Sequence, residues 1–241
     1  MTSISAKIAM RMKEFLFKEP WRRYCFPMYS YQYSARQLVF LCQCVEETSS
    51  LLGNIAEIGC ERGHTTIFLN NFMSTEGIDK KYFALDTFSG FVREDVEFEV
   101  AKRSKRSFMY TGFKVNKKKW FDGTMEQNNI GRVTSIEADV NHFDLTDLGP
   151  IAFAILDVDL YRPIKKALPE LYSVLNPGGI IVVDDCDKSN PSWDGSYQAY
   201  QEFVAMHELP SDIVYRKLGV IRKPTQEIES SATSTQRVGT G

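Results

Sequence analysis

Two short apolar segments of this sequence end in pairs of carboxylates: Asp157 and Asp159 close the first, and Asp184 and Asp185 close the second. Alternate residues of a strand share a face, and the ends of neighbouring strands lie about 5 Å apart, so acids from both segments can meet around one ion. Carboxylates without His or Cys favour a hard cation such as Mg2+, Mn2+ or Ca2+. We predict that Asp157, Asp184 and Asp185 hold this metal ion. For Asp159, capping a helix is an equal alternative.

A glycine-containing turn follows an earlier apolar segment and runs into a predicted helix. Gly59 and Gly63 permit the turn and let a ligand approach the backbone, while the helix offers free N–H groups to a polar part of that ligand. The next segment ends in Asp86, 23 residues after Gly63, close to the spacing at which an acid accepts hydrogen bonds from a ribose diol. The residues predicted to bind the cofactor are Glu57, Gly59, Gly63, Thr65, Asp86, Thr87 and Asp139.

The spacing of these glycines separates two classes of cofactor. A dinucleotide such as NAD(P) needs the closely placed glycines of GxGxxG to make room for its pyrophosphate, and this sequence has no such motif. S-adenosylmethionine has a ribose and an adenine but no pyrophosphate, so the sparser pattern predicts this cofactor. An NAD(P)-dependent oxidoreductase or epimerase is the alternative from another class, and a catalytically silent binding subunit stays open as well.

Five short apolar segments alternate with stretches of helical pattern, and most of them end in an acid. Buried strands that alternate with helices indicate a parallel sheet covered on both faces. Ligands of such sheets bind beyond the carboxyl ends of the strands, where these acids fall. We predict a Rossmann-like, doubly wound α/β fold with a mostly parallel sheet, helices on both faces and an antiparallel last strand. The five segments lie at 55–59, 82–86, 133–139, 151–159 and 179–185.

Changes in composition set the expected domain boundaries. Residues 1–34 are predicted to form an N-terminal helix and a segment that covers the cofactor, and residues 35–223 to form the catalytic domain. Residues 224–241 are polar and rich in Ser and Thr, which predicts a disordered tail. The helix expected at 4–18 is basic and amphipathic, so it packs on the domain or on a second copy of the chain in a homodimer. A membrane-surface contact or a lid over the substrate is the alternative.

A basic insertion interrupts the catalytic domain at about 92–131. Eight Lys and Arg residues occur between Ala101 and Trp120, with no acid among them. Such a stretch is either a solvated helix face or a binding surface for an anionic substrate such as a sugar nucleotide or a phosphate. Both interpretations stay open at this point.

Bulk composition narrows the function classes further. A net charge of −2 and a pI of about 6.0 give no general attraction to nucleic acids or membranes. The five cysteines are odd in number and form no CxxC pair, which argues against a disulfide framework and a zinc site. No run of about 18 apolar residues occurs, and the N-terminus lacks the apolar core of a signal peptide. We expect a cytoplasmic protein with no transmembrane segment and no nucleic-acid partner.

Three motifs carry a resemblance to a known family: EIGCERG at 57–63, LDTFSGF at 85–91 and LDVDLYRPIKKALPELYSVLNPGGIIVVDDC at 156–186. With them, roughly residues 30 to 222 resemble the macrocin O-methyltransferase family, which acts on sugar hydroxyls of natural products. The resemblance implies an S-adenosylmethionine-dependent O-methyltransferase with Asp86 on the ribose. The related catechol-type enzymes have metal ligands at the positions of Asp157, Asp184 and Asp185. They carry a catalytic lysine where this chain has Leu160, so that base is missing here.

The predicted reaction is direct displacement of the sulfonium methyl group by a substrate oxygen whose pKa the metal ion lowers. The expected general base is Asp157 or His207, and the latter lies in a context similar to that of a histidine in macrocin-type enzymes. A lone histidine is more often structural. The aromatic segment at 24–36 is expected to close over the cofactor, as in the resembling enzymes, or to pack on the core. A nucleic-acid methyltransferase is disfavoured, because the [DN]PP[YF] element is absent after the fourth segment.

Overall fold

The computed structural model describes residues 4–18 and 31–225, which fall into two compact units divided after Ser34. In the first unit, helix α1 (Ile4–Lys18) confirms the helix predicted there. Of the predicted tail at 224–241, residues 226–241 lie outside the described residues, and so do residues 24–30 of the aromatic segment at 24–36. Among the helices of the described part of the chain, none is long and apolar enough to span a bilayer.

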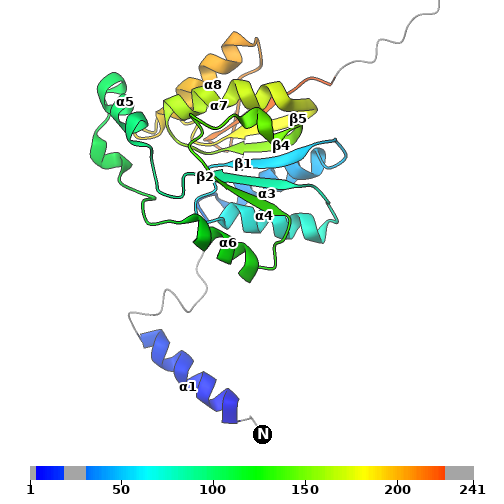
Figure 1. Cartoon of the computed structure of the whole chain (residues 1–241), viewed down its shortest axis with the longest axis vertical. Coiled ribbons are helices and arrows are strands. Elements are labelled where there is room, and N and C mark those ends of the chain that lie inside the picture. Colours follow the sequence, from blue (N-terminus) through cyan, green and yellow to red (C-terminus); the bar gives the residue numbers. More distant parts are fainter. Residues whose placement is uncertain (1–3, 19–30, 226–241) are drawn as a thin grey trace, which may run out of the picture. The chain divides into compact units, whose positions relative to one another are not determined.

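The second unit is built on a seven-stranded sheet with the order β3-β2-β1-β4-β5-β7-β6 (Figure 1). The strands from β3 to β5 are parallel to their neighbours, and β7 is antiparallel to both β5 and β6, which confirms the predicted mixed sheet. The strand order changes direction between β1 and β4, the place where open parallel sheets bind ligands. The strands are β1 (Asn54–Ile58), β2 (Tyr82–Asp86), β3 (Val133–Glu137), β4 (Ile151–Leu156), β5 (Leu175–Val183), β6 (Asp212–Val214) and β7 (Leu218–Arg222).

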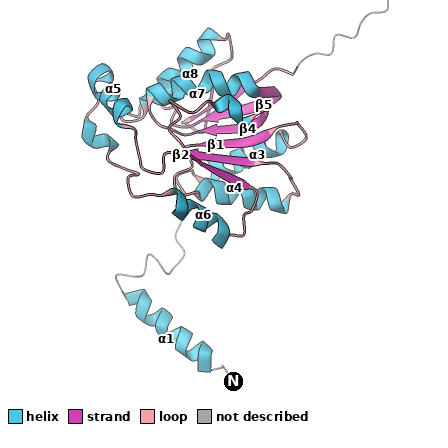
Figure 2. Cartoon of the chain, viewed as in Figure 1, coloured by secondary structure: helices cyan, strands magenta, loops and turns pink. Residues whose placement is uncertain are grey.

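Helices cover both faces of this sheet, as predicted for a doubly wound fold (Figure 2). Helices α7 and α8 pack together on one face, and α3 and α4 lie on the other. Helices α5 and α6 and the short 3-10 helix η1 belong to the insertion between β2 and β3. The helices of this unit are α3 (Ala35–Glu47), α4 (His64–Thr75), α5 (Arg93–Arg103), η1 (Ser107–Tyr110), α6 (Lys118–Gln127), η2 (Leu145–Leu148), α7 (Tyr161–Val174) and α8 (Asp194–Met206).

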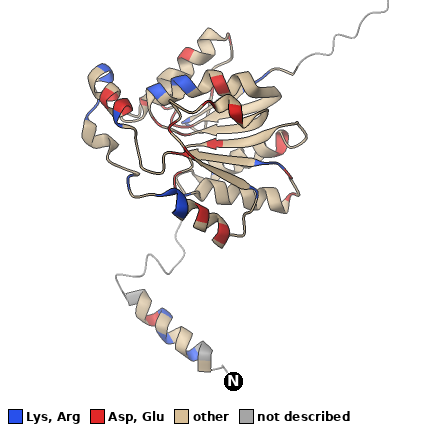
Figure 3. Cartoon of the chain, viewed as in Figure 1, with Lys and Arg blue, Asp and Glu red and all other residues tan. Residues whose placement is uncertain are grey.

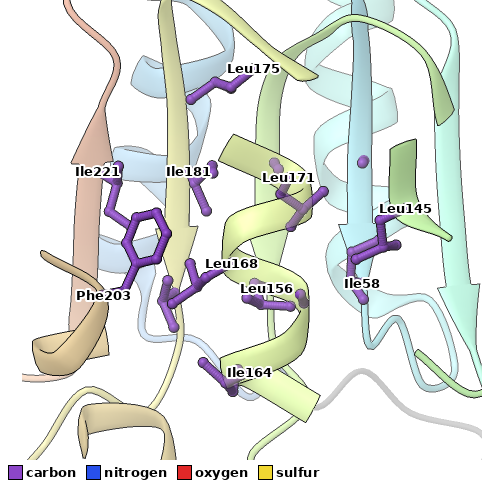
Figure 4. Close-up of a cluster of buried hydrophobic side chains, with 14 of the residues drawn as sticks. Ile58, Leu145, Leu156, Ile164, Leu168, Leu171, Leu175, Ile181, Phe203 and Ile221 are labelled. Atoms are coloured by element: carbon purple, nitrogen blue, oxygen red, sulfur yellow. The ribbon is translucent and has the colours of Figure 1, made fainter. Parts of the chain in front are cut away.

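The central strand β4 anchors the core, because all six of its side chains are buried. Leu156 of β4 lies in one apolar cluster with Leu168 of α7 and Ile181 of β5 (Figure 4). Burial of a side chain of this size contributes about 1.5–3 kcal/mol. At the end of this packed region, the backbone N–H of Asp184 donates to the carbonyl oxygen of Leu156 at 2.9 Å. The carboxyl ends of β4 and β5 are therefore held firmly side by side.

Candidate active site

The turn after β1 is packed so tightly that glycine is required at two positions. Gly59 has a φ of 93°, and a Cβ atom there would lie 1.8 Å from the carbonyl oxygen of Asp157. Gly63 has a φ of 86° and precedes α4, and a Cβ atom there would lie 2.8 Å from the ring of Phe121. The two glycines therefore let the turn pack closely against Asp157 and Phe121, and they place it directly before the N-terminus of α4, where a ligand can meet free backbone N–H groups.

Asp86, at the end of β2, fixes the two turns that flank the predicted ribose site. Its Oδ2 accepts a hydrogen bond from the backbone N–H of Glu61 at 2.9 Å, and its Oδ1 accepts one from Phe88 at 2.7 Å. Burial raises the pKa of Asp86 above its usual value, although both N–H groups act in the opposite direction. Each carboxylate oxygen has room for a further donor, so the two hydroxyls of a ribose can be accepted here.

Three other predicted cofactor residues lie near the carboxyl ends of β1, β2 and β3. Thr65 is buried in the first turn of α4, and the Thr87 hydroxyl donates to the carbonyl oxygen of Gly90 at 2.7 Å. Asp139 follows β3, and its Oδ2 lies 2.8 Å from Nδ1 of His142. These positions fit a cofactor that extends from β1 towards β3, while direct contacts with it stay predictions.

Glu57 differs from the other predicted cofactor residues because it is almost fully buried, with 3% of its surface exposed. Its Oε2 accepts hydrogen bonds from the hydroxyls of Thr66 at 2.6 Å and Tyr82 at 2.7 Å. Burial raises the pKa of Glu57 to about 7. The hydroxyls of Thr66 and Tyr82 therefore already provide hydrogen bonds to this buried carboxyl, and its contact with the cofactor stays a prediction.

Four aspartates form an acid cluster at the ends of β4 and β5: Asp157, Asp159, Asp184 and Asp185. Leu156 pairs with Val183 across the two strands, so the residues that follow them meet at the same sheet edge. Asp159 and Asp185 have φ values of 60° and 55°, a left-handed conformation that Asp tolerates better than most residues. Burial raises the pKa of Asp159 well above its usual value, and the charges of the neighbouring aspartates add to this effect.

Lys217 neutralises part of the acid cluster. It lies in the turn between β6 and β7, and its Nζ is 2.7 Å from Oδ2 of Asp184 and 3.4 Å from Oδ1 of Asp185. Burial opposes the charge of this ammonium, but the surrounding aspartates raise its pKa above the usual value. Burial also raises the pKa of Asp184 to about 6. Lys217 was not predicted from the sequence, because only the antiparallel pairing of β7 with β5 brings it to the acids.

The donor atoms of the acid cluster fit a hard divalent cation. Oδ1 of Asp184 is buried and has no hydrogen-bond partner among the described residues, so nothing there compensates for the loss of its water. Within residues 4–18 and 31–225, however, no three His, Cys, Asp or Glu side chains are already arranged to hold a metal ion. The fold thus brings the predicted ligands Asp157, Asp184 and Asp185 to one place, and metal binding itself stays a prediction.

His207 is not brought to the acid cluster. It caps the C-terminus of α8, where its ring packs 4.4 Å from that of Phe203 and 5.5 Å from that of Tyr172. Ser196, in the first turn of the same helix, is the residue that reaches the cluster, since its hydroxyl donates to the carbonyl oxygen of Asp159 at 3.0 Å. At 1.5 Å per residue, roughly 16 Å of helix separate Ser196 from His207. The geometry therefore gives a packing role to this histidine and does not support the predicted role as base.

A buried ion-pair network connects the insertion to the acid cluster, and it too was missed in the sequence. Glu99 of α5 accepts the backbone N–H of Tyr161, the first residue of α7, at 2.9 Å. Arg103 donates to Glu99 at 2.8 Å and to Asp194 of α8 at 2.9 Å. The partner of Glu99 on α7 lies 62 residues away along the chain, and the partner of Arg103 on α8 lies 91 residues away, so no local sequence pattern predicts these contacts.

The macrocin-O-methyltransferase (TylF) family model matches residues 24–218. No curated protein matches the chain significantly. The structure of the O-methyltransferase NovP superimposes with a TM-score of 0.64 and 18% identity, covering 78% of this chain and 80% of NovP. The calicheamicin methyltransferase CalS11 gives a TM-score of 0.67 and 20% identity, covering 92% of this chain and 94% of its own.

A further structure of CalS11, without ligand and described as a TDP-rhamnose 3'-O-methyltransferase, gives a TM-score of 0.57 and 17% identity, with coverages of 92% and 96%. At these identities the structural likeness establishes the fold alone. The family match is a separate finding, and it spans most of the chain. On that ground, together with the shared fold, the chain belongs to the macrocin O-methyltransferase family and is an S-adenosylmethionine-dependent methyltransferase.

Proposed function

We propose that this enzyme transfers the methyl group of S-adenosylmethionine to a sugar hydroxyl, and that a divalent cation, Mg2+, assists the transfer. The observation that carries the proposal is the contact between two neighbouring strand ends. The backbone of Gly59 in the cofactor turn lies directly against the carbonyl oxygen of Asp157 in the acid cluster. A methyl donor on β1 and a hydroxyl activated on β4 would then be close enough for direct displacement.

In this reaction the hydroxyl oxygen forms a bond to the methyl carbon while the carbon–sulfur bond breaks, and S-adenosylhomocysteine leaves. The hydroxyl proton passes to a carboxylate of the acid cluster, for which we assign Asp157. Asp86 would hold the ribose, and the turn from Gly59 to Gly63, with the N-terminus of α4 behind it, would hold the rest of the cofactor.

Asp157, Asp184 and Asp185 are the residues that would hold Mg2+, which would lower the pKa of the bound hydroxyl. The unpartnered Oδ1 of Asp184 supports this assignment, since a buried carboxylate oxygen without a donor is costly unless a ligand compensates for it. Lys217 gives the four acids a positive counter-charge of their own, so the cation has to compete with an ammonium for Asp184.

A sugar acceptor is supported by the family and by the relatives. Macrocin is the acceptor named for the family, and one CalS11 structure is described as a TDP-rhamnose methyltransferase. We also infer that the acceptor is anionic, because the insertion beside the site is rich in Lys and Arg. The four described cysteines are free, which fits a cytoplasmic location, and α1 is the surface we assign to a homodimer contact.

Calorimetric titration of S-adenosylmethionine, followed by MgCl2, tests the proposal. Asp86→Ala removes the acceptor for two backbone N–H groups and for the ribose, and we expect it to weaken cofactor binding by roughly 10- to 100-fold. Asp184→Asn is expected to abolish Mg2+ binding and to leave cofactor binding intact. Glu46→Gln, on the exposed side of α3, is the control for both. A wild-type protein that binds no S-adenosylmethionine would overturn the proposal and favour a silent subunit.

A further inference from the structure

An aromatic cluster, made of Phe91, Tyr110, Phe113 and Trp193, joins three segments of the chain. The Phe91 ring stacks on Trp193 at 5.6 Å, and the Tyr110 ring meets both of them near edge-on, at 5.8 Å and 5.5 Å. Phe113 packs edge-on against Phe91 at 5.4 Å. Tyr110 is buried, Phe91 and Trp193 are half-buried, and Phe113 is 39% exposed. The cluster therefore keeps flat apolar surface within reach of solvent.

One side of the aromatic cluster adjoins the acid cluster. The hydroxyl of Tyr110 donates to the carbonyl oxygen of Ser192 at 3.1 Å. Ser196, three residues after Trp193, donates to the carbonyl oxygen of Asp159 at 3.0 Å. The segment that carries Trp193 thus continues into the contact with the predicted reaction centre.

The other side of the aromatic cluster adjoins the cofactor turn through Lys114. A Cβ atom at Gly90 would lie 3.2 Å from both Cγ and the backbone nitrogen of Lys114, so the stem of this lysine packs on the turn that follows Asp86. Two residues later, the side chain of buried Asn116 donates to the carbonyl oxygen of Glu61 at 2.8 Å. Lys114 and Lys117 therefore flank a segment that is fastened to the predicted cofactor turn.

Several cations of the insertion are not neutralised by a carboxylate, although Nζ of Lys117 lies over the ring of Trp120, 5.5 Å from its centroid. Arg103 and Lys105 pair with Asp194, and Lys118 pairs with Asp122. Among the described residues, no carboxylate lies within ion-pair distance of the other five, which are Lys102, Arg106, Lys114, Lys117 and Lys119. Figure 3 shows the resulting basic stretch at the start of α6. Cations left unpaired beside an apolar surface favour an anionic ligand with an apolar face.

We infer that the aromatic cluster, Lys114 and Lys117 bind the methyl acceptor, and that this acceptor is a sugar bearing a phosphate group. The sugar ring packs its C–H face on the exposed parts of Phe113 and Trp193, and the phosphate oxygens accept hydrogen bonds from the two ammonium groups. A phosphate suits this site better than a carboxylate does, because it carries more negative charge and has three oxygens to share between two lysines. The inference rests on the proposed function, since it names the acceptor of the same reaction.

Calorimetry on the full chain saturated with S-adenosylhomocysteine and MgCl2 tests this inference. The probes are UDP-glucose, glucose 1-phosphate, inorganic pyrophosphate and neutral methyl glucoside; they distinguish a diphosphate from a monophosphate and from the anion alone. We expect at least one phosphorylated sugar to bind more than tenfold tighter than methyl glucoside. Its binding should weaken as NaCl is raised, as for any contact between exposed charges.

Three variants separate the two parts of the site. Lys114→Ala and Lys117→Ala are each expected to weaken binding of the phosphorylated sugar roughly tenfold and to leave methyl glucoside unaffected. Phe113→Ala is expected to weaken the binding of the phosphorylated sugar and of methyl glucoside, and to leave the binding of pyrophosphate unaffected. Lys81→Ala is the matched control, because this exposed lysine precedes β2 at the opposite edge of the sheet.

The outcomes distinguish this inference from the proposed function. If S-adenosylhomocysteine does not bind, the proposed function itself fails. If it binds but no phosphorylated probe does, or if both lysine variants bind the probes as tightly as wild type, the inference fails and the proposed function stands. A phosphorylated sugar that binds no more tightly than methyl glucoside overturns the inference as well.

Discussion

The ammonium of Lys217 lies 2.7 Å from Oδ2 of Asp184, so a cation built into the chain already contacts one of the predicted metal ligands. Asp184 is 3% exposed and the side chain of Lys217 is 24% exposed, so water screens this ion pair only in part. Any added divalent cation has to displace or share this partner. The pair therefore links the stability of the fold to the affinity for metal.

Replacing Lys217 with Met should expose that link. The variant leaves Asp184 and Asp185 without their counter-charge, and we expect unfolding to become easier by about 2 kcal/mol, or roughly 4–8 °C in the melting temperature. Mg2+ should then stabilise the variant more than it stabilises wild type, because the competitor is gone. Thermal unfolding with and without MgCl2 measures both effects. A variant whose melting temperature is the same with and without MgCl2 would contradict the proposed metal site.

The carboxyl of Glu57 should make stability depend on pH. Its pKa is raised to about 7 in the folded protein, so between about pH 4.5 and 7 the folded chain binds more protons than the unfolded chain. Stability should therefore fall as the pH rises through this window, by a total on the order of 3 kcal/mol.

Glu57→Gln should flatten this profile, because the amide oxygen can still accept from Thr66 and Tyr82 but carries no proton to lose. Urea unfolding at pH 5 and pH 7.5 provides the measurement. The exposed Glu46→Gln variant should keep the wild-type slope. Equal slopes for wild type and Glu57→Gln would show that this carboxyl is ionised throughout.

The tight contact at Gly59 predicts a severe effect of one methyl group. In Gly59→Ala the new Cβ atom would lie 1.8 Å from the carbonyl oxygen of Asp157, at a backbone φ of 93°. We expect a loss of more than about 3 kcal/mol in unfolding free energy, together with loss of cofactor binding. Gly123→Ala is the matched control, since this glycine lies in α6 with no atom of the described residues near a new Cβ, and the variant should gain up to about 1 kcal/mol. Similar effects of the two changes would refute the close contact of β1 with β4.

The network around Arg103 predicts strong coupling between this arginine and the buried Glu99 of the same helix. Arg103→Met leaves the buried Glu99 uncompensated, and we expect it to cost about 3–5 kcal/mol in unfolding free energy. Adding Glu99→Gln should recover part of this loss, which a double-mutant cycle in urea measures. The exposed pair Arg93–Glu97 on the same helix, also four residues apart, should couple by no more than about 0.5 kcal/mol. Equal coupling energies in the two cycles would show that burial adds nothing to the strength of the Arg103–Glu99 pair.

The parts of the site that follow directly from strands were predictable from the sequence. The alternation of apolar segments and the acids at their ends predicted the sheet and placed Asp86, Asp157 and Asp184 at one edge of it. The start of β5 was harder to predict. The segment was expected from Gly179, whereas the strand begins at Leu175 and includes a Pro-Gly-Gly stretch that resembles a turn in sequence.

Roles that depend on distant partners could not be predicted. Glu57 matched a cofactor motif, yet the hydroxyls that hold it come from Thr66 in α4 and Tyr82 in β2. His207 was placed by a similar local context, and only the direction of α8 shows that its ring points to a packing site. Local pattern carries information about elements, whereas pairings across 62 or 91 residues arise only when the chain has folded.

The backbone contact between Gly59 and Asp157 leaves no side chain between the two halves of the predicted reaction centre. Substitutions there cannot adjust one half without disturbing the other, so this junction offers little freedom for change. The insertion, in contrast, reaches the same place through side chains, such as Glu99 of α5 and Asn116 of the segment before α6. Substitutions in the insertion can therefore change the acceptor during evolution, while the residues at the strand ends that carry out the chemistry stay the same.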